Sequence, residues 1–256
     1  MNYKLICVIP LYKTTPRLVM PLIASLTRHN GSNLVFYKFY YDDTVPEKIL
    51  SLIREILIAC QTGTYGFDFE YCKNSHSGYK RNLGIQYALK YNIKYIWFID
   101  QDDWLLEPFV FDSAIQALEQ NNTPIIRVNF DVPKDLGDFN VKTIKGTATM
   151  PWQYVFEVES IKDYKFSETI EYGSDISFVI FYLLDHKYLI QEDVNKFYWI
   201  NMMPLSKIPL YFYNYLNSSS VMGTVKTDIS NPEYNKVIEM LAANLKETKN
   251  GKQETT

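Results

Sequence analysis

The chain has 256 residues, 47% of them hydrophobic and 21% charged, which is the composition of a globular protein with a substantial core. Its formal net charge is −3 and its pI about 5.7, so it lacks the basic excess of a nucleic-acid binder, and on charge we do not expect nucleic acid as a partner. Three cysteines without a CxxC spacing indicate neither a disulfide framework nor a zinc site. No signal-peptide pattern and no apolar run of about eighteen residues is present, so we expect a cytoplasmic protein, at most peripheral at a membrane.

Hydrophobic patterning predicts a regular alternation of strands and helices up to residue 100. Continuous apolar runs indicate buried strands, and apolar residues three and four apart indicate helices. In chain order we expect strand Leu5–Pro10, helix Pro16–Gly31, strand Leu34–Tyr41, helix Pro46–Cys60, strand Phe67–Lys73, helix Tyr79–Asn92 and strand Lys94–Asp100. This alternation predicts an α/β fold with a mostly parallel sheet and helices on both faces.

The second half of the chain is less regular, and we expect it to belong to the same domain. Its elements are predicted as helix Asp112–Asn122, strand Pro124–Phe130, an aperiodic polar stretch Asp131–Thr149, strand Pro151–Val158, helix Ser174–His186, a surface turn at Glu192–Trp199 and strand Ile208–Leu216. A single domain is expected over residues 1–225. A C-terminal helix and a polar, disordered tail are expected at 226–256.

Acidic residues follow two of the expected strands. Asp42 and Asp43 end the second strand, and Asp100, Asp102 and Asp103 end the fourth, in the stretch FIDQDDW. Parallel sheets bind ligands beyond the carboxyl ends of their strands. Three acids within four residues repel one another, and a hard divalent cation carrying a diphosphate would relieve that repulsion. A turn that caps the next helix explains the cluster equally well from the local sequence.

An ordered series of motifs resembles the family 2 glycosyltransferases, which have the GT-A fold. The series is Val8-Ile9-Pro10-Leu11-Tyr12, Asp42-Asp43, Arg81-Asn82-Leu83-Gly84 with Ala88, Asp100-Gln101-Asp102-Asp103, Pro151-Trp152 with Phe156, Lys165-Phe166-Ser167-Glu168, Gly173-Ser174-Asp175-Ile176-Ser177-Phe178, and Tyr211-Phe212-Tyr213 followed by Ser218–Ser220. Each motif alone is weak, but their order and spacing hold over about residues 4–222. The chain departs from the family pattern at Ser174, where a glutamate is usual, and Glu171 is the nearest upstream glutamate.

The resemblance implies a glycosyltransferase of the hexosyltransferase type. Such an enzyme transfers one sugar from a nucleotide diphosphate sugar, by default a UDP-sugar, to a hydroxyl of a glycan, lipid-linked or protein acceptor with inversion. Mn²⁺ or Mg²⁺ assists departure of the diphosphate. The resemblance also implies a nucleotide-sugar-binding half at about residues 1–104 and an acceptor-side half at 105–225. Because the chain has neither a Q-x-x-R-W motif nor transmembrane helices, single-sugar addition is expected.

The same resemblance assigns roles to individual residues. It implies nucleotide-sugar-binding residues Pro10, Tyr12, Asp43, Arg81, Asp100 and Asp102, metal ligands Asp102 and Asp103, and the catalytic base Asp175. Tyr12 would stack on the base, Asp43 would accept the base N–H, and Arg81 would meet the base or the diphosphate. Asp103 is expected as the more direct metal ligand, with Asp102 also reaching the ribose.

Other interpretations remain for both the residues and the chain. Taken singly, Tyr12 is also a packed loop aromatic, Arg81 a solvated helix residue and Asp175 a helix-terminal acid. Trp152 is expected in the core or the acceptor-side wall, and His76 in a solvated loop. A nucleotide-binding module without turnover is one alternative function. A sugar nucleotidyltransferase is another, but the loop PLYKTTPR lacks the glycines that cradle a triphosphate.

Overall fold

The computed structural model describes residues 2–61, 63–131, 150–169, 174–193, 196–199 and 205–212. In chain order its elements are β1 (Leu5–Pro10), α1 (Pro16–Thr27), β2 (Val35–Tyr41), α2 (Glu47–Ala59), β3 (Tyr65–Tyr71), α3 (Ser77–Lys90), β4 (Tyr95–Phe98), β5 (Trp104–Leu105), α4 (Val110–Asn121), β6 (Ile125–Asp131), the 3₁₀ helix η1 (Pro151–Gln153), β7 (Tyr154–Glu157), the 3₁₀ helix η2 (Val158–Ile161), α6 (Ser174–Asp185), β8 (Leu189–Asp193), β9 (Lys196–Trp199) and β10 (Leu205–Phe212). The polar stretch expected after Asp131 and the C-terminal helix and tail lie outside the described residues.

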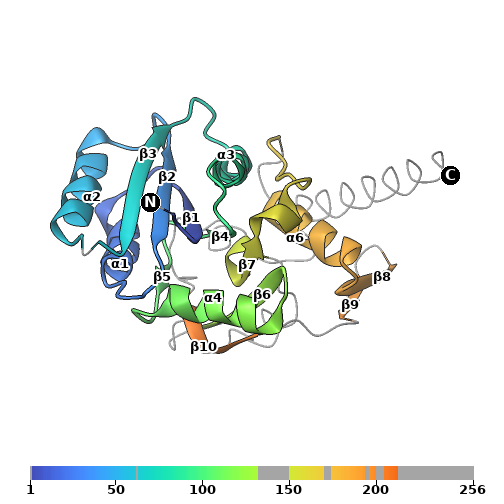
Figure 1. Cartoon of the computed structure of the whole chain (residues 1–256). Helices are drawn as coiled ribbons and strands as arrows, with labels where there is room; N and C mark the ends of the chain where they lie inside the picture. The colour runs from blue at the N-terminus through green and yellow to red at the C-terminus, as the bar shows by residue number, and fades with distance from the viewer. Residues whose placement is uncertain are drawn as a thin grey trace, which may run out of the picture.

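The main sheet of the described residues contains eight strands in the order β3-β2-β1-β4-β7-β6-β10-β5 (Figure 1). Strands β3, β2, β1 and β4 are mutually parallel, β7 pairs antiparallel with both β4 and β6, and β10 runs parallel to β6. The strand–helix alternation up to β4 therefore builds a parallel half-sheet, as predicted. The antiparallel β7 marks the change to the less regular second half.

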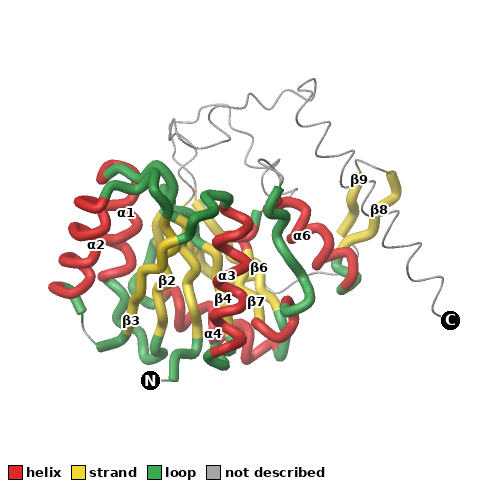
Figure 2. The backbone as a smooth tube through the Cα atoms, turned by 90° about the horizontal axis from the view of Figure 1, so that it is seen from above, coloured by secondary structure: helices red, strands yellow, loops and turns green. Residues whose placement is uncertain are grey.

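Helices cover both faces of this sheet (Figure 2). Alternate residues of β1 point to opposite sides, so Leu5, Cys7 and Ile9 pack with α1, α2 and α4, whereas Ile6 and Val8 pack with α3 and α6. All six residues of β1 are buried, which explains why its sequence is continuously apolar. The predicted two-sided arrangement is confirmed.

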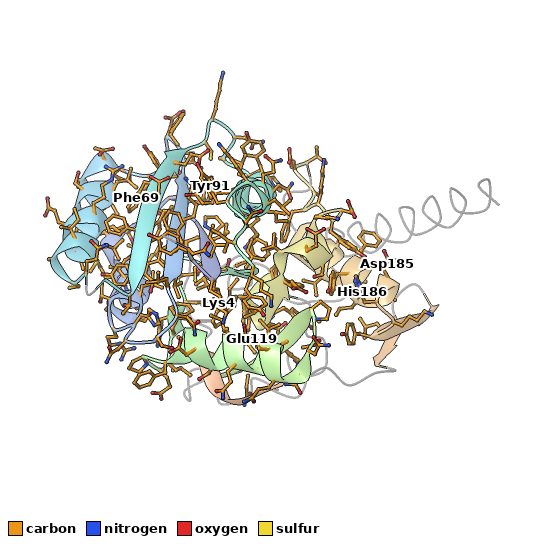
Figure 3. The ribbon with its side chains drawn as sticks, in the orientation of Figure 1. Lys4, Phe69, Tyr91, Glu119, Asp185 and His186 are labelled. Carbon is orange, nitrogen blue, oxygen red and sulfur yellow. The ribbon has the colours of Figure 1, made fainter. Side chains whose placement is uncertain are left out.

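Glycine permits a close approach of α3 to the sheet. A Cβ atom on Gly84 would lie 2.4 Å from Cγ2 of Val8, so the helix backbone rests directly on the branched side chain of β1. At the other end of β1, the ammonium of Lys4 lies 2.8 Å from Glu119 of α4 (Figure 3). Gly84 thus lets α3, which carries the Arg-Asn motif, lie directly on β1, and Lys4 links the start of the same strand to α4.

Some boundaries differ from those expected. The predicted strand Pro151–Val158 has 3₁₀ turns at both ends. At its start, Pro151 has no N–H to donate to a strand ladder. The surface turn predicted at Glu192–Trp199 is wrong, since β8 and β9 form an antiparallel pair with Leu189 opposite Trp199. The aromatic run Phe197-Tyr198-Trp199 favours a strand and carried that signal in the sequence. Among the described residues, no helix has the length and apolar character required to cross a membrane.

Candidate active site

The carboxyl ends of β2, β1 and β4 lie side by side at one edge of the sheet. The parallel registers align Pro10 with Tyr40 and Val8 with Phe98. The loops that follow these three strands carry the acidic pairs and the tyrosine predicted from sequence. Residues about 30 and 90 positions apart in the chain therefore meet at the edge where parallel sheets bind ligands.

Asp42 and Asp43 follow β2 and have different surroundings. Asp42 is 4% exposed, and its carboxylate lies 2.5 Å from Lys80 Nζ and accepts hydrogen bonds from the N–H and hydroxyl of Thr44. Burial raises the pKa of Asp42, but the hydrogen bonds from Lys80 and Thr44 outweigh it and lower the pKa below its ordinary value. Asp43 is exposed and accepts a hydrogen bond from the hydroxyl of Tyr71, which raises the pKa of that phenol. Asp43 is thus the acid of this pair that a ligand can reach.

Tyr12 lies in the loop after β1, which ends at Pro10. Its side chain is 44% exposed, so a ring face is accessible from solvent. Its backbone is held by Gln101, whose amide accepts from the N–H of Tyr12 at 3.2 Å and donates to its carbonyl at 2.7 Å. The loop of Tyr12 therefore touches the turn that carries the acidic cluster.

Arg81 lies between two carboxylates from opposite halves of the chain. Its guanidinium donates to Asp100 at 2.7 Å and also forms an ion pair with Asp175 in the first turn of α6. The Arg81 side chain is only 4% exposed, and its guanidinium lies 5.6 Å from the ring of Phe166. Arg81 is therefore a buried link between the end of β4 and α6. This burial differs from the interpretation of Arg81 as a solvated helix residue. Its predicted contact with the base or the diphosphate stays a prediction.

The acids of the FIDQDDW stretch separate into distinct environments. Asp102 is half-buried, and burial together with the negative charge of Asp100 raises its pKa to about 6. Asp100 likewise has its pKa raised by burial, against the opposing influence of Arg81. Asp103 is 1% exposed. Accessibility thus favours Asp102 over Asp103 for contact with a ligand from solvent.

The donor set at this turn fits a hard divalent cation bound mainly by its substrate. Within the ranges that the structure describes, no group of three or more His, Cys, Asp or Glu side chains is arranged to hold a metal ion. Mg²⁺ in phosphate sites commonly takes one or two carboxylates, with water and phosphate oxygens completing its shell. The accessible carboxylate of Asp102 supplies such a ligand beside the strand ends.

The segment Lys165–Glu168 is fixed to α3 by Asn82. The side-chain amide of Asn82 donates to the carbonyl of Phe166 and to Glu168, and its oxygen accepts the N–H of Phe166. The ring of Phe166 stacks on Phe178 of α6 with centroids 3.9 Å apart. Two motifs that the sequence only placed in order are therefore in contact, and they support the wall on which Asp175 lies.

Four residues at this edge were not assigned a role from sequence: Lys80, Asn82, Gln101 and Tyr71. Their partners are 28 to 89 residues away in the chain, so no local pattern reveals these contacts. Lys80 carried one signal, because a lysine within a helix that packs on a buried strand needs a charged partner. Trp152 is buried and accepts a hydrogen bond from Trp97 through its carbonyl, which confirms a core position. His76 caps α3 by accepting the N–H of Gly78.

Several members of the motif series lie outside the described residues. They are Gly173, Tyr213, Ser218–Ser220 and the side chain of Ser174, and Glu171 upstream of them lies outside as well. The predictions made from Ser174 and from the residues after Phe212 therefore stay predictions.

Solved structures with this arrangement of strands and helices share the fold. Residues 1–349 of S. aureus TarS in complex with UDP match with a TM-score of 0.65 and 13% identity over 94% of this chain. A mannosyltransferase from Pyrobaculum calidifontis, PcManGT, in complex with GDP-Man and Mn²⁺ matches with a TM-score of 0.53 and 10% identity over 73% of this chain. The predicted GT-A fold is confirmed.

The likeness extends over only part of each of those proteins. The chain covers 64% of TarS 1–349 and 53% of the mannosyltransferase, and 39% of the longer TarS structure. No protein-family model and no curated protein sequence matches the chain. At 10–14% identity the likeness is one of fold, so the chemistry rests on the residues at the strand ends.

Proposed function

We propose that this chain is a family 2 glycosyltransferase that transfers a single sugar from a nucleotide diphosphate sugar to an acceptor hydroxyl with inversion. One observation carries the proposal. Arg81 contacts both Asp100, at the end of the expected nucleotide half, and Asp175, at the start of α6 in the expected acceptor half. An acid assigned to the donor and an acid assigned to proton removal are thus within one guanidinium of each other, although they are 75 residues apart in the numbering. Capping or surface roles for the single acids do not require that arrangement.

The donor occupies the edge formed by the ends of β1, β2 and β4. Asp43 accepts a hydrogen bond from an N–H of the nucleobase, and the exposed ring of Tyr12 stacks on the nucleobase. Asp102 reaches the ribose and would hold Mn²⁺ or Mg²⁺ together with Asp103, which the resemblance implies as the more direct ligand and which is buried in the free protein. A bound divalent cation neutralises charge on the departing diphosphate. UDP is proposed as the nucleotide, and PcManGT, bound to GDP-Man, makes GDP the comparison to test.

Transfer requires a base on the face of the sugar opposite the diphosphate. The acceptor oxygen forms a bond to the anomeric carbon, the bond from that carbon to the diphosphate oxygen breaks, and the hydroxyl proton passes to Asp175. The nucleoside diphosphate leaves with the bonding electron pair. Arg81 fixes the carboxylate of Asp175 in place, and Asn82 holds the adjacent segment through Phe166. The ion pair with Arg81 limits the rotamers of Asp175, the proton acceptor, before the acceptor substrate enters.

The test is donor hydrolysis and transfer with a panel of UDP- and GDP-sugars, with and without Mn²⁺. We expect release of a nucleoside diphosphate from one donor class and an inverted linkage in the product. Nucleotide binding without turnover across donors and acceptors would replace the enzyme with a binding module. Pyrophosphate release from a nucleoside triphosphate and a sugar 1-phosphate would replace it with a nucleotidyltransferase.

A further inference from the structure

Gln101 joins the turn after β4 to the loop after β1 with three hydrogen bonds. Its Nε2 donates to the carbonyl of Tyr12 at 2.7 Å, and its Oε1 accepts from the N–H of Tyr12 at 3.2 Å and from the hydroxyl of Thr14 at 2.6 Å. Both backbone groups of Tyr12 are therefore paired with one side chain 89 residues away. This is the pairing that a neighbouring strand would provide, supplied here by an amide.

The same loop contains a strained residue and has further attachments. Lys13 has φ 46°, in the left-handed region that a residue with a Cβ rarely occupies. Its N–H donates to the hydroxyl of Thr44 at 2.8 Å, and the carbonyl of Leu11, two residues earlier, accepts from Lys80 at 2.7 Å. A strained conformation persists when the surroundings over-determine it, and such positions gather at ligand sites. The loop is thus held in a defined shape by contacts from β4, the end of β2 and α3.

Gln101 differs from Thr44 and Lys80, which also hold this loop, because it belongs to the acidic turn after β4. It stands between Asp100 and Asp102, the acids assigned to the donor and the metal, and its side chain reaches the loop of Tyr12, the residue assigned to the base. We propose that Gln101 is a positioning residue that fixes the base-binding loop to the metal-binding turn, so that one rigid unit binds both ends of a nucleoside diphosphate. This inference rests on the proposed function for its ligand. The three hydrogen bonds of Gln101 to the loop are present in the free protein.

The chemistry of the side chain explains why an amide suits this place. Glutamine offers a donor and an acceptor at one end, which match the carbonyl and the N–H of Tyr12. Glutamate keeps the two accepted bonds but sets a carboxylate oxygen against that carbonyl. Alanine removes all three bonds. The variants Gln101→Glu and Gln101→Ala therefore form a graded series.

The first measurement is hydrogen–deuterium exchange of residues 11–15 in the free protein. We expect faster exchange in Gln101→Ala, an intermediate rate in Gln101→Glu, and no change in Gln120→Ala, an exposed glutamine on α4. Exchange in β1 and β4 should be unchanged, which shows that the variants fold. A loop that exchanges in Gln101→Ala as it does in the parent protein overturns the proposal.

The second measurement is the affinity for UDP and GDP with Mn²⁺, by calorimetry. Gln101→Ala should weaken nucleotide binding about tenfold, which corresponds to the net contribution of about one hydrogen bond to ordering the loop. The kcat at saturating donor should remain within about threefold, because Asp175 and Arg81 are untouched. Equal affinity in Gln101→Ala and the parent overturns the positioning role. If the parent binds neither nucleotide, the proposed function fails, and the exchange result still decides whether Gln101 holds the loop of Tyr12 in place.

Thr14→Val provides a variant that leaves the acidic turn intact. It removes only the hydroxyl that donates to Gln101 and should raise the exchange rate less than Gln101→Ala does. In the Gln101→Ala background, Thr14→Val should have no further effect, since its partner is already absent. Full additivity of the two substitutions contradicts the shared contact.

Discussion

Asp42 and Asp43 are neighbouring carboxylates with separate tasks. The buried Asp42 pairs with Lys80 and holds the turn together, whereas the exposed Asp43 accepts a hydrogen bond from the hydroxyl of Tyr71. A ligand can displace a phenol from an exposed acid at little cost, but it cannot displace a buried ammonium without leaving two unpaired charges. Structural and ligand-binding functions are therefore divided between adjacent residues.

Removing the exposed acid should affect ligand binding alone. Asp43→Ala is expected to weaken nucleoside diphosphate binding by about ten- to a hundredfold, the range for a lost hydrogen bond to a charged group. Its melting temperature should equal that of the parent, because Asp43 is exposed. Calorimetry and thermal unfolding provide the two readouts. A variant that binds the nucleotide as tightly as the parent contradicts the assignment of Asp43 to the base.

The pair Asp42–Lys80 predicts a pH-dependent stability difference. Because the folded-state pKa of Asp42 is lowered, its stabilising contribution is present above the unfolded value, near 3.9, and is lost as pH falls through the folded value. Lys80→Met should destabilise the protein by about 3–5 kcal/mol at pH 7, since a buried carboxylate loses its partner. The deficit should shrink toward pH 4, because without Lys80 burial raises the pKa of Asp42, and the unpaired carboxylate of the variant takes up a proton there.

Urea unfolding of Lys80→Met and the parent at pH 7 and pH 4 measures this difference. Lys48→Met, an exposed lysine of α2, is the matched control and should show little change at either pH. An equal loss for Lys80→Met at both values would mean that packing of the lysine stem, and not its charge, stabilises the turn.

The proposed base has a direct kinetic test. Asp175→Asn should lower kcat by about 10²–10⁴-fold, the usual contribution of a positioned base, and leave donor binding unchanged. Asp185→Asn, at the exposed end of the same helix, controls for charge on α6. Sugar transfer by Asp175→Asn at the parent rate would remove Asp175 from the mechanism.

The sequence predicted which acids gather at the sheet edge but not how they are divided. The order of the motifs located Asp43, Asp102 and Asp175, because motif spacing carries chain-order information. It could not distinguish Asp42 from Asp43 by environment, or expect the burial of Arg81, because burial depends on segments folded over from elsewhere. Lys80 reaches Asp42 across 38 residues, and Asp175 reaches Arg81 across 94.

At the scale of elements, α3 presents consecutive residues to separate parts of the site. Lys80 points to the ends of β1 and β2, Arg81 to β4 and α6, and Asn82 to the segment at Phe166. The helix can do this only where it lies close to the sheet, and Gly84 permits that approach. A small displacement of α3 would disturb all three contacts together.

Gly84→Ala tests the close approach. The new methyl group meets the stiff, buried Val8, and overpacking of this kind costs about 1–3 kcal/mol, more than the gain of up to about 1 kcal/mol in helix propensity. Urea unfolding should show net destabilisation. The double variant Gly84→Ala with Val8→Ala should be more stable than the sum of the single effects predicts, because the clash is gone. Simple additivity would contradict direct contact between α3 and β1.

Elements were predictable where periodicity was strong. The buried strands β1, β2 and β4 and the helices α1 to α4 were found within a few residues, because their apolar faces are repeated in the sequence. The short strand β5 was missed, and β8 and β9 were mistaken for a turn. The two-residue strand β5 pairs with the distant β10, so no local window reveals it. The β8–β9 hairpin did carry a local signal, the aromatic run Phe197-Tyr198-Trp199, which was not given enough weight.

At the scale of the whole molecule, ligand binding should stabilise the fold. Binding to the native state at a hundred times the Kd adds about 2.7 kcal/mol, and each kcal/mol raises the Tm of a domain of this size by about 2–4 °C. We therefore expect a clear rise in Tm with UDP and Mn²⁺ together. Asp102→Asn should lose the Mn²⁺-dependent part of that rise. The same Mn²⁺ effect in this variant would assign the metal to another residue.

The strand order places β7 between β4 and β6, although β4 and β7 are separated by more than fifty residues of chain. During synthesis on the ribosome, the parallel half-sheet from β3 to β4 is complete long before β7 emerges. Until then β4 has one unpaired edge, and an unpaired hydrophobic edge strand invites pairing with another chain. Slower translation between residues 100 and 150 would lengthen that exposure. The protein's yield in cells should therefore depend on chaperones that act on nascent chains more than its stability after folding would indicate.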